Sequence, residues 1–301
     1  MRKNQLQKSV TISRNAKPLN VLSLFDGISC GQHVLRHYLK VKQLNYWASE
    51  IEAAPIRNTL HNFPNTIQLG DVCKIDPNKL PVMDLLIGGS PCQGFSFSGH
   101  GLNFDDPRSK LFFEYVRIYR ALRKRNPKLK FLLENVVMSP KSKSVISKYM
   151  EVEPMYIDSA LFSAQSRKRL YWTNIPLAPL PETEVALCLQ DILDPPYYGG
   201  AFVERVNPHK NGWKQNRLVS NIFGKSPTIT KCKPVCVNIP LSYHTSRTAT
   251  IHEIERLAGL PDDYTLNCGS FTSRYGSVGN GWECNTIAFI LNYFNPKNTK
   301  R

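Results

Sequence analysis

Long apolar runs are missing from this sequence. No apolar stretch among its 301 residues approaches the roughly 20 residues that a helix needs to cross a bilayer. The first residues, MRKNQLQKSVTISRNAK, have no apolar centre and therefore do not resemble a secretory signal. We expect a cytoplasmic protein without a membrane span, in which residues 1–17 form a short basic arm.

Closely spaced cysteines are also scarce. The eight cysteines are scattered along the chain, which is typical of reduced cytoplasmic thiols rather than of a disulfide framework. Cys232 and Cys236, in CKPVC, have a spacing that zinc sites use, but no second pair lies at a suitable distance. We therefore expect no bound metal.

Acidic residues are few, and none occurs from residue 205 to residue 252. The chain has 39 Lys and Arg against 23 Asp and Glu, a formal net charge of +16 that favours a polyanionic partner. Trp213, Phe223 and Tyr243 are interleaved with the basic residues of the acid-free stretch, and this mixture suits a nucleic-acid backbone. The basic residues in question are Arg205, Lys210, Lys214, Arg217, Lys225, Lys231, Lys233 and Arg247.

The sequence does contain short apolar segments that alternate with helical patterns. Strand patterns occur at 21–25, just before residue 50, and in TIQLGDVCKI, VMDLLIGGSPC and LKFLLENVV. This alternation predicts an α/β fold of the Rossmann-like type, with a mostly parallel, doubly wound sheet. Ligands bind beyond the carboxyl ends of such strands. The polar residues at or just past these ends are Asp26, Glu50, Asp71, Cys92 and Glu134.

The character of the chain changes after RLYWTNIP. Residues 176–246 are rich in Pro, Gly and Asn, and lose the alternation of strands and helices. A helical pattern returns in TIHEIERLAGLP and TIAFILNYF. We expect a main domain at 18–175, a smaller domain at 176–246, and a C-terminal segment at 247–301 that packs back on the main domain.

The first turn, FDGISCGQ, has features of a cofactor site. Gly27 and Gly31 permit a close approach of the backbone, but the turn is not GxGxxG, so a pyrophosphate is poorly supported. Glu50 is placed to bind a ribose, and Asp71 could accept a hydrogen bond from an adenine amine. A nucleoside without a pyrophosphate, such as S-adenosyl-L-methionine, fits this set best.

Three further motifs follow in order: GGSPCQGFS, LLENV and QSRKRLYW. With them the sequence resembles the DNA (cytosine-5)-methyltransferase family from residue 19 to about residue 295. The first motif is similar to the eukaryotic de novo subgroup and to bacterial or phage members. The resemblance implies transfer of a methyl group from S-adenosyl-L-methionine to carbon-5 of a flipped-out cytosine in a specific duplex DNA sequence. It also implies a catalytic and cofactor-binding domain at 18–175, a target-recognition domain at 176–246, and a bacterial or phage-infected cell.

The resemblance implies four catalytic roles. The Cys92 thiolate would add to carbon-6 of the cytosine and make carbon-5 nucleophilic. Glu134 would hydrogen-bond ring nitrogen 3 and the exocyclic amine, and so stabilise protonation as charge develops. Arg169 would hold the carbonyl oxygen of the base, and Arg167 would support the site.

The resemblance also assigns binding residues. In the last motif Gly281 replaces a serine that is common in the family. Thr228 matches the threonine of a pair in the recognition region, and Arg247 matches a motif that supports that region. The DNA-binding candidates are Gln93, Ser96, Ser98, Thr228 and Arg247. The cofactor candidates are Phe25, Asp26, Gly27, Ile28, Gly31, Glu50, Ile51, Asp71, Val72, Pro91, Leu111, Asn280, Gly281 and Trp282.

Two alternatives stay open at this point. One subgroup of the same fold methylates tRNA, and a basic surface does not separate the two substrates. A catalytically inactive relative would have a damaged PCQ or ENV motif, but both are intact. We expect a monomer that binds duplex DNA, either as an orphan enzyme or alongside a restriction endonuclease.

Overall fold

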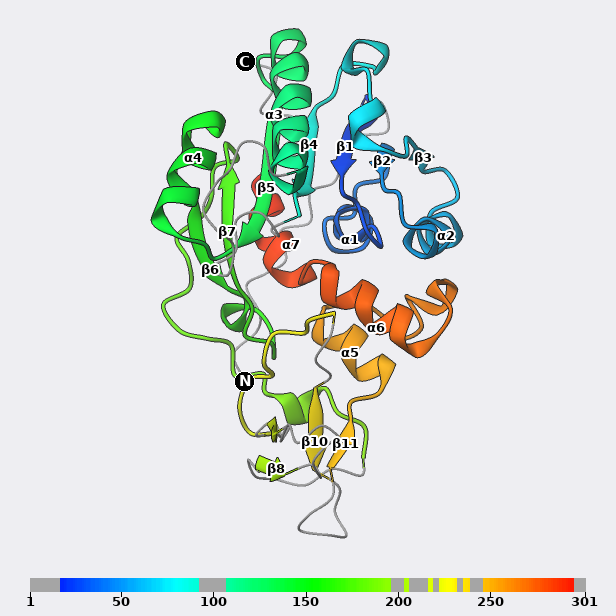
Figure 1. Ribbon diagram of the computed structural model, residues 1–301, viewed down its shortest axis with the longest axis vertical. Helices are drawn as coiled ribbons and strands as arrows, with labels where there is room; N and C mark the ends of the chain where they lie inside the picture. The colour runs from blue at the N-terminus through cyan, green and yellow to red at the C-terminus, as the bar shows by residue number, and fades with distance from the viewer. Residues whose placement is uncertain are drawn as a thin grey trace.

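A computed structural model provides the structure of the chain (Figure 1). It describes residues 17–91, 107–195, 203–205, 216–218, 222–231, 235–238 and 246–294. Within those ranges no helix is long and apolar enough to cross a membrane.

A seven-stranded sheet forms the centre of the molecule, in the order β3-β2-β1-β4-β5-β7-β6. All neighbouring strands are parallel except β7, which runs antiparallel to β5 and β6. The mostly parallel α/β fold predicted from the sequence is therefore confirmed. The strands are β1 (Leu19–Leu24), β2 (Leu44–Ser49), β3 (Ile67–Gln68), β4 (Leu85–Gly89), β5 (Lys130–Val136), β6 (Met155–Asp158) and β7 (Lys168–Thr173).

Helices cover both faces of this sheet (Figure 1). In the first part of the chain these are α1 (Cys30–His33), which continues as a π-helical turn (Val34–Tyr38), α2 (Ala53–Asn62), α3 (Pro107–Arg125) and α4 (Pro140–Met150). The C-terminal helices are α5 (Ile251–Leu257), α6 (Phe271–Asn280) and α7 (Cys284–Asn292). Short 3-10 turns lie at Val72–Lys74, Pro77–Lys79, Ser159–Leu161, Leu189–Asp191 and Leu266–Cys268.

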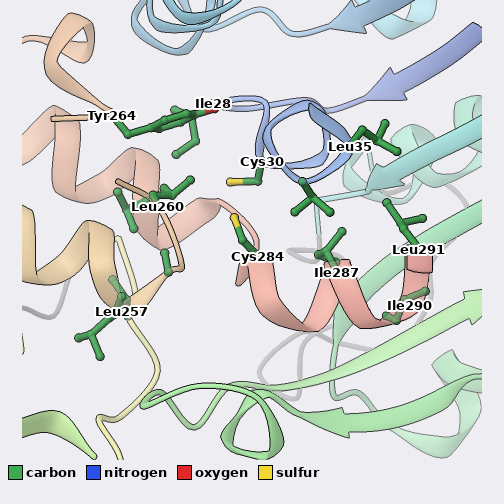
Figure 2. Close-up of a cluster of buried hydrophobic side chains, with 14 of the residues drawn as sticks. Ile28, Cys30, Leu35, Leu257, Leu260, Tyr264, Cys284, Ile287, Ile290 and Leu291 are labelled. Atoms are coloured by element: carbon green, nitrogen blue, oxygen red, sulfur yellow. The ribbon is translucent and has the colours of Figure 1, made fainter. Parts of the chain in front are cut away.

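Strand β1 is buried along its whole length because its side chains feed two cores. Leu22 and Leu24 pack with apolar side chains of α3 and α4 on one face of the sheet. Val21 belongs to the core on the other face, where α1 and α7 meet. Figure 2 shows that second core, in which Cys30 faces Cys284 at the start of α7 and Ile28 lies beside Tyr264. Helix α7 thus packs on the helical segment that follows the first strand.

The region from residue 176 to residue 250 contributes little regular structure to the described residues. Two antiparallel pairs lie there: β8 (Val203–Arg205) with β9 (Asn216–Leu218), and β10 (Cys236–Asn238) with β11 (Ser246–Thr248). Leu189, Ile222 and Ile229 nevertheless belong to the same core as α1 and α7. We call residues 222–231 the recognition segment below.

Candidate active site

The reversed direction of β7 brings Arg169 to Glu134. Because β7 is antiparallel to β5, its first residues lie beside the last residues of β5, and Arg169 is in register with Val136. Arg169 Nε lies 2.9 Å from Glu134 Oε1, and the two side chains are only 14% and 12% exposed. A parallel β7 would have placed this arginine at the opposite edge of the sheet.

Trp282 reaches the same carboxylate from the connection between α6 and α7. Its indole Nε1–H donates to Glu134 Oε2 at 3.2 Å. We predicted from the sequence that Trp282 would line the cofactor site, but not that it would contact Glu134. The two residues are 148 positions apart, so that only tertiary packing reveals their proximity.

Arg167 is buried and its guanidinium is engaged by backbone carbonyls. Nη1 donates to the Ile229 carbonyl at 2.9 Å, and Nη2 donates to the carbonyls of Gly279 and Gly281 at 3.2 and 2.9 Å. Burial, the largest cause, lowers the pKa of Arg167 to about 10. Arg167 therefore connects the recognition segment to the end of α6, next to the site.

The predicted nucleophile lies outside the described residues. The same is true of Gln93, Ser96 and Ser98. The chain is described up to Pro91, two residues beyond the end of β4, where Gly89 is in register with Glu134. Asn135 Nδ2 donates to the Ser90 carbonyl and hydroxyl oxygens at 3.3 and 3.2 Å. The chain that leads to Cys92 is thus attached beside Glu134.

The turn after β1 has an unusual backbone. Phe25, Gly27 and Ser29 have φ values of 58°, 56° and 59°, in the left-handed region. The Glu50 carboxylate holds this turn, since its Oε2 accepts from the Gly27 N–H at 2.8 Å. Its Oε1 accepts from the N–H groups of Ile51 and Glu52 at 2.7 and 2.9 Å. The turn and the end of β2 therefore form one unit.

Asp26 lies in this turn and accepts hydrogen bonds from two hydroxyl groups. Tyr46 donates to Oδ1 at 2.8 Å, and Ser29 donates to Oδ2. Burial is the largest influence on its pKa and raises it to about 6, although these hydrogen bonds oppose the shift. Burial thus brings the pKa of this carboxyl, in the turn of the predicted cofactor site, closer to neutral pH.

The surface beside Glu50 suits a nucleoside. A Cβ added at Gly27 or Gly70 would meet nothing within 4 Å, so there is open space over both glycines. Ile51 is 73% exposed and offers an apolar surface beside the Glu50 carboxylate. Asp71 uses Oδ1 to accept from the Cys73 N–H at 2.9 Å, which leaves Oδ2 for other donors. The chain thus provides apolar and acceptor groups around an opening.

The remaining cofactor candidates differ in exposure. Ile28 and Val72 are buried in the two cores, so only their backbone could face a ligand. Gly31 is closely packed: a Cβ there would overlap Ile87 and touch Trp282. Pro91, Leu111, Gly281 and Trp282 are partly exposed, and Asn280 is exposed.

Both DNA-binding candidates among the described residues are bonded to the protein itself. The Thr228 hydroxyl donates to the Ser166 carbonyl at 2.8 Å. Arg247 makes two 2.7 Å bonds to the Glu253 carboxylate and one of 3.0 Å to the Asp194 carbonyl. These contacts join the region around Thr228 and Arg247 to its neighbours, and a role of either residue in DNA binding stays a prediction.

Comparisons with known sequences point to one family. A model of the C-5 cytosine-specific DNA methylases matches residues 19–175. The orphan methyltransferase M.SPRI of Bacillus phage SPR is 43% identical over 120 residues, which are 39% of this chain and 26% of the phage protein. The type II methyltransferase M1.ScrFI of Lactococcus lactis subsp. cremoris is 28% identical over 316 residues, covering 92% and 78% of the two chains. The chain thus spans about a quarter of the length of M.SPRI and most of M1.ScrFI.

Solved structures share the fold over nearly the whole chain. The Entamoeba histolytica methyltransferase EhMeth matches with a TM-score of 0.70 and 17% identity, covering 95% of this chain and all of that one. Dnmt2 from S. pombe matches with a TM-score of 0.69 and 16% identity, covering 92% and 99%. With the family model matched across all seven strands of the sheet, the chain belongs to the C-5 cytosine-specific DNA methylases of the bacterial and phage type.

Proposed function

We propose that the protein transfers a methyl group from S-adenosyl-L-methionine to carbon-5 of a flipped-out cytosine in duplex DNA. The observation that carries this proposal is the Glu134 carboxylate, held between Arg169 and Trp282 at the edge where β4 delivers the chain to Cys92. Membership of the methylase family supports the same reaction.

The reaction requires a nucleophile, a group that binds the amidine edge of the base, and a cation. Cys92 would add its thiolate to carbon-6, so that carbon-5 gains the electron density needed to attack a methyl group. Glu134 would accept from the exocyclic amine and stabilise a proton on ring nitrogen 3. Arg169, whose Nε is bonded to Glu134, would use its remaining N–H groups to bind the carbonyl oxygen.

The proton on carbon-5 then has to leave. Its loss to a base and the departure of the Cys92 sulfur from carbon-6 restore the aromatic ring and the free thiol. A base inside a duplex cannot reach the sulfur, so the cytosine must leave the stack, at a cost of a few kcal/mol.

The cofactor would bind over the turn that follows β1. S-adenosyl-L-methionine would supply an electrophilic methyl group. Glu50 would accept from the ribose hydroxyl groups, Ile51 would pack on the adenine, and Asp71 would accept from its amine. No metal ion has a role in this reaction scheme.

Covalent trapping tests the mechanism directly. The protein is incubated with S-adenosyl-L-methionine and a duplex whose target cytosine carries fluorine at carbon-5. Fluorine cannot leave as a proton does, so an adduct through Cys92 should persist on a denaturing gel and by mass spectrometry. Cys92→Ala should form no adduct and should lose methyl transfer by more than about a thousandfold. Full activity of this variant would refute the mechanism.

The substrate is tested by offering tritiated methyl donor with duplex DNA and with tRNA. We expect transfer to DNA, and transfer to tRNA alone would overturn that choice. Bisulfite sequencing of DNA from expressing cells would then identify the target sequence. We also propose that the protein is a monomer. The relatives include both orphan and type II methyltransferases, so it acts either alone or alongside a restriction endonuclease.

A further inference from the structure

We propose that Trp282 is a positioning residue for Glu134, in addition to any contact with the cofactor. Its indole N–H fixes the carboxylate oxygen that Arg169 leaves unbonded, and this orients Glu134 toward the cytosine. The expected effect on kcat rests on the proposed function. The hydrogen bond itself can be tested without measuring activity.

The first argument concerns the acceptor capacity of the carboxylate. Each oxygen of Glu134 can accept about two hydrogen bonds. Arg169 Nε uses one position on Oε1, and Trp282 Nε1 uses one on Oε2. One position on each oxygen is left, and cytosine offers two neighbouring groups, the amine and protonated nitrogen 3. The hydrogen bonds from Arg169 and Trp282 therefore fix the plane of the carboxylate. Each oxygen can still accept one hydrogen bond from the cytosine.

Glycines on two neighbouring elements make room for the indole ring. A Cβ at Gly89, the last residue of β4, would lie 3.2 Å from Trp282 Nε1 and 2.8 Å from Glu134 Oε2. A Cβ at Gly31, in α1, would lie 3.4 Å from the Trp282 ring. The indole thus lies between the helix of the cofactor turn and the catalytic carboxylate, in contact with both.

The backbone on either side of Trp282 is firmly held. The Gly281 carbonyl accepts from Arg167 at 2.9 Å. Glu283, which is 2% exposed, caps α7 by accepting from the N–H groups of Asn285 and Thr286 at 3.1 and 2.8 Å. The Cys284 N–H donates to the Ala258 carbonyl at 2.9 Å. These bonds limit the movement of Trp282, as a positioning role requires.

The test is Trp282→Phe, which keeps an aromatic ring between the glycines but removes the N–H donor. We expect kcat to fall about tenfold, because a hydrogen bond to a charged group is lost, with little change in cofactor affinity by calorimetry. Trp172→Phe is the matched control. That indole donates to Ser147 Oγ at 3.1 Å in the core on the other face of the sheet, so kcat should stay at the wild-type value.

A second measurement tests the bond by itself. In ¹⁵N-labelled protein the four tryptophans give four indole N–H signals, and the one that Trp282→Phe removes belongs to Trp282. Glu134→Gln should move that signal and leave the others in place. In the Glu134→Gln background, Trp282→Phe should cause no further loss of residual kcat.

Two outcomes would overturn the proposal: a wild-type kcat for Trp282→Phe, or an indole signal that does not respond to Glu134→Gln. An equal loss of kcat in the Trp282→Phe and Trp172→Phe variants would also count against it, since that would indicate general loosening of the fold. Lack of methyl transfer by the unaltered protein would refute the proposed function instead, and the indole signal would still report on the bond.

Discussion

The sheet region and the recognition segment are held in place by different forces. Around β1, apolar side chains fill two cores and leave few charges inside. The recognition segment adds only Ile222 and Ile229 to these cores, and it is attached in addition through cations that bind backbone carbonyls. Lys225 Nζ donates to the carbonyls of Ser163, Val185 and Leu187 at 2.9, 2.7 and 2.8 Å. Arg167 reaches the Ile229 carbonyl from the other side.

The difference teaches that net charge is a poor measure of a nucleic-acid surface. Lys225 and Arg247 both belong to the acid-free stretch whose charge suggested DNA contacts. Each is bonded to groups of the protein, Lys225 to three carbonyls and Arg247 to Glu253. A segment that is too short for its own core can be fixed by charge-assisted hydrogen bonds, so part of its basic character serves the fold.

Replacing the buried Arg167 should have the largest effect on how the recognition segment is held. Arg167→Met leaves three carbonyls without their donor, and we expect the free energy of unfolding to fall by about 3 kcal/mol. The burial that lowers the pKa of Arg167 is relieved at the same time, which limits the loss. Chemical denaturation measures the change.

Hydrogen exchange locates the effect of Arg167→Met. Exchange should accelerate in 222–231 and around 279–281, and not in β1 or β4. Arg167→Lys is the control, because it keeps the charge but cannot span three carbonyls. It should recover only part of the loss. Uniform acceleration across the sheet would contradict the view that this cation holds the recognition segment.

Lys225→Met and Lys231→Met together distinguish a lysine that stabilises the fold from a lysine that binds DNA. We expect Lys225→Met to lower the free energy of unfolding by about 2 kcal/mol, because three hydrogen bonds to the ammonium group are lost. Lys231 is exposed, so we expect it to affect DNA binding rather than stability. Its removal should leave stability unchanged and reduce the salt dependence of DNA binding by about one ion.

Salt titrations of DNA binding and denaturation curves separate these two lysines. If Lys225→Met changed only the affinity for DNA, the lysine would belong to the binding surface, as its sequence context first suggested.

The smallest predicted effect on stability comes from Asp26, a buried carboxyl group beside the sheet. Burial raises the pKa of Asp26 to about 6 from an ordinary value of 3.8. The folded state therefore holds a proton more tightly than the unfolded chain, and the cost of the carboxylate is fully present above pH 6. Asp26→Asn should be more stable than the wild type by about 1–2 kcal/mol at pH 7, less than the roughly 3 kcal/mol of the pKa shift, because an amide has one oxygen for the two hydroxyl donors.

This advantage of Asp26→Asn should shrink as the pH falls from 6 to 4, since the wild-type carboxyl then becomes neutral. His33 has the opposite influence, because burial lowers its pKa to about 4. The wild type and Asp26→Asn both contain His33, so its contribution cancels in the difference between their free energies of unfolding. A difference that stayed constant with pH would show that Asp26 carries no such charge cost.

The sequence predicted the frame of the site well. Apolar runs marked the buried strands, and the polar residues that follow them did lie around one edge: Asp26 and Glu50 after β1 and β2, and Glu134 near the end of β5. These positions follow from local pattern, because a parallel sheet collects the carboxyl ends of its strands. Glu134 lies within β5 rather than past its end, since the strand continues to Val136.

The sequence did not predict which side chains meet across the edge. The contact of Trp282 with Glu134 depends on how α6 and α7 pack against α1, and no local spacing encodes that packing. The internal roles of Arg167 and Lys225 were hidden for the same reason. A cation looks the same in a sequence whether it faces a carbonyl of its own chain or a phosphate of DNA.

The packing of α7 against the helix that follows β1 has a consequence for protein synthesis. A ribosome adds about 5–20 residues per second, so the helix that follows β1 waits on the order of tens of seconds for α7. During that time apolar side chains such as Val34 and Leu35 are uncovered and open to aggregation or chaperone capture. Trp282 also follows the whole sheet in the sequence. A nascent chain that has been synthesised only through β7 therefore lacks the contact that Trp282 makes with Glu134.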